Sequence, residues 1–144
     1  MLISGKWLLC DDDIIRPIVE GLVSVNDGSA LLVEFLVDTG ADRTAFSGRI
    51  LSVLGLPTVP APEQLGGVGG EAQTVLVNTQ IALFREDSSK ITFRGHFAGF
   101  TDPDALDMSV LGRDITNLFA LIVDRPQDCV CLLGQNHQYV VRGN

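Results

Sequence analysis

The sequence predicts one mostly-β domain, and three observations support this fold class. Apolar residues alternate with polar ones, or form β-branched runs, in seven segments, whereas helix signals are confined to two short stretches. The chain has 144 residues, a length typical of a single domain. Hydrophobic residues make up 46% of it, enough for a core with apolar surface to spare for a partner chain. We therefore expect residues 1–144 to form one domain that associates with another chain.

The expected strands follow one another along most of the chain, with turn-forming residues between most of them. Asn26-Asp27-Gly28-Ser29 and the polar segment 85–90 predict two hairpins, because both contain residues suited to tight turns. Arg125-Pro126-Gln127-Asp128 predicts the turn of a third hairpin near the C-terminus. The strands are expected at residues 14–25, 30–37, 74–84, 91–100, 108–111, 121–124 and 129–133.

Two short helices are expected between these strands. Ser47 is a candidate N-cap for a helix that runs to Leu54 and is stopped by Gly55. Asp114 is the candidate N-cap of a second helix that ends near residue 119 or 120.

Charge and hydropathy exclude two classes of partner. The formal net charge is −8, and only two lysines are present, so the basic stripe that a nucleic-acid backbone requires is missing. The apolar stretch in residues 1–10 is interrupted by Gly5 and Lys6 and followed by three aspartates, which is too short for a membrane span. We expect a soluble protein with no membrane segment and no nucleic-acid ligand.

The cysteines indicate a reducing compartment. Cys10, Cys129 and Cys131 are odd in number, and the last two would share one face of a strand, where neighbours do not bridge easily. His96 and His137 fall at no metal-ligand spacing to them. We expect reduced thiols, a cytoplasmic location, and neither a metal site nor a cofactor.

One tripeptide has the composition of a catalytic site. Leu36-Val37-Asp38-Thr39-Gly40-Ala41 places a carboxylate directly after an apolar strand, followed by a small hydroxyl residue and a glycine that permits a tight turn. The alternative is a strand-ending turn in which Asp38 merely accepts backbone N–H groups. The tripeptide alone does not choose between these interpretations.

Two further segments lie after it in the chain, and together the three resemble the retropepsins, single-domain aspartic proteases. Leu65-Gly66-Gly67-Val68-Gly69-Gly70 is similar to the glycine-rich flap of that family. Val110-Leu111-Gly112-Arg113-Asp114 is similar to its second signature. The resemblance covers about residues 17–133, leaves residues 134–144 as a tail, and favours a cellular relative over a viral one. It implies a closed, barrel-like fold that is active as a two-fold symmetric homodimer.

The resemblance also implies roles for individual residues. Asp38 is the expected catalytic carboxylate, and the Thr39 hydroxyl is expected to bond to the partner's active-site loop. Gly40 is expected to hydrogen-bond the substrate backbone. Asp42 and Arg113 are expected to pair and brace the loop that also contains Ala41, although both could be ordinary solvated charges.

The glycine-rich segment is expected to act as a flap. Gly66, Gly67, Gly69 and Gly70 around Val68 give a hairpin tip with little bulk and wide backbone freedom, suited to closing over a substrate. A flexible surface turn is the alternative. The substrate polypeptide would lie extended below the flap, bonded like an added strand.

The mechanism itself requires two chains. Water attack on a peptide bond needs a base and an acid, and two carboxylates that share one proton supply both. The sequence contains one Asp-Thr-Gly, so two copies of Asp38 must meet at a homodimer interface. The expected function is aspartic endopeptidase; the alternatives are a catalytically silent dimerisation or peptide-binding module, and a monomeric barrel. The place of Trp7, in the core or on a partner, stays open.

Overall fold

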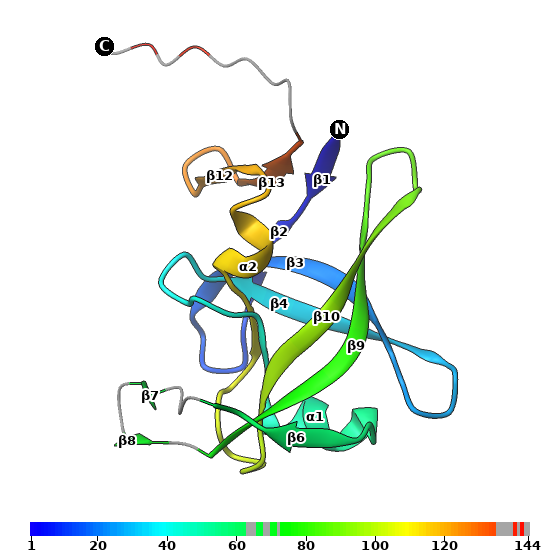
Figure 1. Cartoon of the computed structure of the whole chain (residues 1–144). Coiled ribbons are helices and arrows are strands. Elements are labelled where there is room, and N and C mark those ends of the chain that lie inside the picture. Colours follow the sequence, from blue (N-terminus) through cyan, green and yellow to red (C-terminus); the bar gives the residue numbers. More distant parts are fainter. Residues whose placement is uncertain (63–65, 68–69, 72, 135–139, 141, 143–144) are drawn as a thin grey trace.

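The computed structural model describes residues 1–62, 66–67, 70–71, 73–134, 140 and 142, and Figure 1 shows their arrangement. The longest strands of the described part have 10 or 11 residues, and shorter strands and two short helices make up the rest. The elements are β1 (Leu2–Ser4), β2 (Lys6–Leu9), β3 (Ile15–Ser24), β4 (Ala30–Val37), β5 (Ala45–Phe46), α1 (Gly48–Leu54), β6 (Thr58–Pro60), β7 (Gly66–Gly67), β8 (Gly70–Glu71), β9 (Thr74–Phe84), β10 (Lys90–Phe100), β11 (Ser109–Leu111), α2 (Arg113–Thr116), β12 (Ala120–Asp124) and β13 (Cys129–Leu133).

Six of these strands close into a barrel. In the order β3, β4, β11, β5, β10, β9 each strand pairs with the next, and β9 pairs back with β3. The closing ladder joins Gly21 to Leu83 and Val23 to Ile81. β2 and β6 extend the barrel beside β3 and β9, respectively. The expected barrel-like, mostly-β fold is therefore confirmed.

The barrel interior is filled by the inward side of the alternating strands. Phe35 on β4 and Phe46 on β5 are fully buried, with ring centroids 6.0 Å apart, and Phe97 on β10 contacts Phe46 edge-on at 6.2 Å. The outward positions of β4, including Leu32 and Glu34, stay exposed. The period-2 pattern of the sequence thus corresponds to one core face and one solvent face.

The expected long strands agree closely with the structure. The strands expected at 30–37, 74–84 and 129–133 have these same bounds, three others differ by one residue at one end, and the strand expected at 14–25 is one residue shorter at each end. The strands that the sequence analysis did not predict are β1, β2, β5 and β6, all of two to four residues, whereas β7 and β8 belong to the hairpin expected in the glycine-rich segment. Elements this short carry too few residues for a periodicity to be recognised.

The prediction was correct for α1 and wrong for the start and length of α2. The Ser47 side chain accepts the Ile50 N–H at the beginning of α1, and Gly55 ends the helix in the left-handed conformation. In α2, Gly112 is the N-cap without a side-chain bond, and the helix ends at Thr116. Asp114 does not cap α2, because its carboxylate binds Thr44 instead.

A second, three-stranded sheet brings the chain's first strand beside its last one. β13 lies between β1 and β12, with Leu2 opposite Leu133. Trp7 packs on the core beneath the β12–β13 turn, and its Nε1–H lies 3.3 Å from the carbonyl oxygens of Asp124 and Cys129. Trp7 therefore packs against the core of its own chain.

Cys10, Cys129 and Cys131 are all free thiols. Burial and the neighbouring Cys129 raise the pKa of Cys131 to about 11, so this thiol stays protonated at neutral pH.

Neither helix of the described chain has the length and apolar character needed to cross a membrane.

Candidate active site

Asp38 lies where the two sequence signatures meet. It follows the last residue of β4, and β4 runs parallel to β11, with Leu36 opposite Val110. The Asp38 N–H donates to the Leu111 carbonyl oxygen at 3.2 Å. Residues more than 70 positions apart therefore form one surface at the carboxyl ends of two adjacent strands.

The turn after β4 is held by the Asp38 carboxylate. The Gly40 N–H donates to Asp38 Oδ1 at 2.9 Å, and the Ala41 N–H donates to the Asp38 carbonyl oxygen at 3.3 Å. Asp38 is half-buried, while Thr39 and Gly40 are exposed. This is the turn that the non-catalytic interpretation expected, and it orients one carboxylate oxygen without excluding the catalytic interpretation.

The second signature holds the loop after Asp38 at several points. The Arg113 N–H donates to the Ala41 carbonyl oxygen at 2.9 Å, and Arg113 Nη1 donates to the Thr39 carbonyl oxygen at 2.6 Å. Arg113 Nη2 forms an ion pair with Asp42, as expected from the sequence. One guanidinium group therefore fixes both sides of the Asp38 turn, although it is itself partly exposed.

Thr44 and Asp114 complete this brace, and the sequence analysis assigned neither to it. The Thr44 hydroxyl donates to Asp114 Oδ1 at 2.7 Å and accepts the Gly112 N–H at 3.1 Å. The Thr44 N–H also donates to Asp114, at 2.9 Å to Oδ1. Thr44 is 0% exposed. Only the fold could reveal this contact, because the two residues are 70 positions apart and each has an ordinary local alternative.

Replacing Thr44 by Val should destabilise the protein by about 1–3 kcal/mol, because it leaves the buried Gly112 N–H without its acceptor and removes one donor to Asp114. Urea unfolding at equal chain concentrations measures this change. Thr58→Val, on the exposed strand β6, is the matched control and should change the free energy of unfolding by less than about 0.5 kcal/mol. Equal stability of the two variants would contradict the role given to Thr44.

The glycine-rich segment contains the start of a hairpin. Gly66 pairs with Glu71 and Gly67 with Gly70 in an antiparallel register, between β6 and β9 along the chain (Figure 1). Val68 and Gly69, the expected tip, lie outside the described residues. The hairpin shape agrees with a flap, whereas the flap's function stays a prediction.

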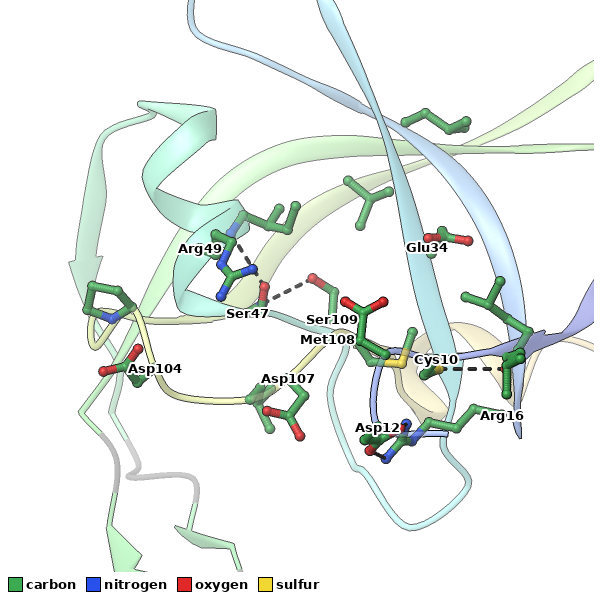
Figure 2. A pocket seen from close by; sticks show the side chains of 18 residues that line it. Cys10, Asp12, Arg16, Glu34, Ser47, Arg49, Asp104, Asp107, Met108 and Ser109 are labelled. Carbon is green, nitrogen blue, oxygen red and sulfur yellow. Dashed lines mark hydrogen bonds and ion pairs between the residues drawn. The ribbon is translucent and has the colours of Figure 1, made fainter. Parts of the chain in front are cut away.

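The expected site does not coincide with a groove that the structure shows elsewhere on the described chain. That groove, of about 800 Å³, lies between the 10–16 loop, β4, the start of α1 and the 103–109 loop (Figure 2). The described residues that line it include neither residues 38–42 nor Arg113. Among the described residues, His, Cys, Asp and Glu side chains also form no group of three or more suited to a metal. The Asp38 loop, whose residues Thr39 and Gly40 are exposed, therefore lies outside this groove.

Comparisons with known proteins agree with this architecture. The family model described as "Aspartyl protease" matches residues 22–137. The solved structure of EIAV protease complexed with the inhibitor HBY-793 is similar with a TM-score of 0.51 and 22% identity, over 71% of this chain and 86% of that one. A retropepsin-like aspartic protease from Rickettsia conorii is similar with a TM-score of 0.55 and 18% identity, over 92% and 88% of the two chains. A search of curated proteins gives no match.

Proposed function

Because the chain belongs to the aspartyl protease family and has the retropepsin fold, we propose that it is an endopeptidase whose active site forms between two identical chains. The observation that carries this proposal is the position of Asp38 on an exposed, braced loop at the ends of β4 and β11. In this proposal residues 1–144 form one protease domain, and Asp38 is its catalytic residue.

Two Asp38 carboxylates supply the acid and the base of the reaction. Like charges held close together cannot both ionise, so the pair holds one proton. The ionised carboxylate removes a proton from a bound water, which attacks the peptide carbonyl carbon, while the protonated carboxyl group donates its proton to the carbonyl oxygen. Proton transfer to the amide nitrogen then releases the two peptide products. The one Asp38 carboxyl group of a single chain can act as the acid or as the base, but not as both at once.

The three-stranded sheet is the surface that we assign to the dimer. Its outer strands, β1 and β12, each pair with β13 alone among the described strands. The outer edge of β1 is partly occupied, because the Leu2 carbonyl oxygen accepts the Glu86 N–H at 3.1 Å, whereas β12 retains an edge for hydrogen bonding. Ile122 and Val123 on β12 and Leu118 just before it are exposed apolar residues. Burial of these side chains by a second chain would stabilise the dimer. A two-fold axis then places the same surface on both partners.

The substrate is proposed to bind as an extended strand beneath the flap at Gly66–Gly70. Leu36 and Ala41 beside Asp38 are apolar and partly buried, which favours apolar side chains near the cleaved bond. The exposed Gly40 backbone allows a substrate main chain to approach closely. We expect an enclosed cleft only in the dimer, in which a second chain covers the exposed residues Thr39 and Gly40.

The decisive experiment measures mass and cleavage on the same sample. We expect light scattering to give a dimer, and denatured casein at mildly acidic pH to be cleaved in a manner that a statine-type inhibitor blocks. Upon dilution below the dimer dissociation constant, the rate per chain should fall steeply, because active dimers decrease faster than chains. A strict monomer at high concentration, or a lack of cleavage across many denatured proteins, would overturn the proposal; tight peptide binding without cleavage would favour a silent binding module.

A further inference from the structure

The groove shown in Figure 2 is lined by exposed apolar and acidic side chains, and the proposed chemistry does not use it. Its apolar part includes Leu9, Leu32 and Leu106, which are 64%, 52% and 39% exposed, respectively. Exposed leucines from three separate segments, gathered around one cavity of about 800 Å³, form an apolar surface that a ligand could cover.

The charges that line the groove select the sign of the ligand. Five carboxylates and two guanidinium groups lie around it. Arg16 is already paired with Asp12, with Nη2 2.6 Å from Oδ2. Glu34 and Asp107 have no side-chain hydrogen bond to another described residue, although Glu34 interacts electrostatically with Lys6. Figure 2 shows Asp107 on a different loop from the Asp12–Arg16 pair. The excess negative charge therefore favours Lys or Arg side chains.

The groove also lies within reach of the proposed active site. Glu34 is four residues before Asp38 on β4, a separation of about 13 Å at ~3.3 Å per residue. The 103–109 loop that forms the opposite wall leads directly into β11 and the second signature. An extended polypeptide bound at Asp38 needs only about four further residues to span this distance.

We propose that this groove is a substrate exosite, which binds an extended segment of the substrate polypeptide that lies outside the cleaved bond and carries alternating apolar and cationic side chains. The apolar side chains cover Leu9, Leu32 and Leu106, and the cationic ones lie beside Glu34, Asp104 and Asp107. The role of the groove in substrate selection rests on the proposed endopeptidase function, whereas the binding of a polypeptide segment in the groove does not.

Binding is tested with two labelled octapeptides, one alternating leucine with arginine and the other leucine with glutamate. Fluorescence anisotropy at low salt, with a statine-type inhibitor in excess to occupy the cleft, should show at least about tenfold tighter binding of the arginine peptide. Asp107→Lys should weaken it about fivefold, and Asp27→Lys, an equal charge change at the exposed tip of the β3–β4 hairpin outside the groove, by less than about twofold. Equal affinity for both peptides, or an equal loss of affinity in both variants, would overturn the assignment of this groove as a binding site.

Cleavage of denatured casein by the same three proteins tests the substrate role. Asp107→Lys should lower kcat/KM several-fold through KM, with kcat and melting temperature close to those of the unmodified protein, and Asp27→Lys should match the unmodified protein. Weaker peptide binding with unchanged kcat/KM would overturn the assignment to substrate. If the unmodified protein cleaves nothing, the proposed function fails, while the peptide titration still decides whether the groove binds a cationic segment.

Discussion

Asp38→Asn should abolish cleavage, lowering the rate on denatured casein by at least about a thousandfold, while the protein folds and dimerises normally. The amide keeps the shape of the carboxylate and an oxygen that can accept the Gly40 N–H, so the turn survives. It cannot share a proton between two partners as a carboxylate pair does, and a dimer loses both groups at once. Casein cleavage, light scattering and thermal unfolding measure the three properties.

Asp27→Asn is the matched control for this substitution. Asp27 holds a similar turn, in which its Oδ1 accepts the Ser29 N–H at 2.9 Å, but it lies at the exposed tip of the β3–β4 hairpin. The control should leave cleavage unchanged. Residual activity of Asp38→Asn equal to that of the unmodified protein would contradict the catalytic assignment.

Mixing Asp38→Asn chains with unmodified chains distinguishes a mechanism that needs two Asp38 carboxylates from one that needs a single carboxylate. If chains exchange freely and mixed dimers are inactive, an equal amount of Asp38→Asn chain should reduce the activity of the unmodified chain to about half, since half of the unmodified chains then sit in mixed dimers. A mixture that retains full activity would indicate that one Asp38 suffices.

The long elements could be predicted because their signals are local. β4, β9 and β13 have the predicted bounds, since alternating apolar residues and flanking turns depend only on neighbours in the chain. The cap and stop of α1 are equally local, with Ser47 at one end and Gly55 at the other. Hydrophobic period and turn chemistry were thus sufficient for most of the barrel.

The brace around Asp38 could be predicted only in part. The resemblance indicated the pair formed by Arg113 and Asp42, but not the contact between Thr44 and Asp114. From the sequence alone Asp114 is a candidate helix cap, and only the antiparallel pairing of β5 with β11, with Ala45 opposite Val110, brings Thr44 to it. Likewise, the groove combines three separate segments and has no motif of its own.

Gly112→Ala should be the most damaging single-methyl change near the site, destabilising the protein by about 3 kcal/mol or more and removing most of its cleavage activity. A Cβ at this position would lie 2.3 Å from the Arg43 carbonyl carbon and 2.7 Å from the Thr44 backbone nitrogen. These atoms are main chain in the braced loop, so they cannot move aside as a flexible side chain would. Separating the two segments would weaken the bonds from Arg113 and Thr44 that position Asp38.

Gly95→Ala on β10 is the control, because an added Cβ there meets no atom within 4 Å. It should leave the free energy of unfolding unchanged or raise it slightly, since alanine loses less backbone entropy than glycine on folding. Urea unfolding at equal chain concentrations and casein cleavage compare the two variants. If Gly112→Ala were as stable and as active as Gly95→Ala, tight contact between the second signature and the Asp38 loop would not be needed to position the carboxylate. The activity of this surface would then depend on the dimer contacts rather than on the internal brace.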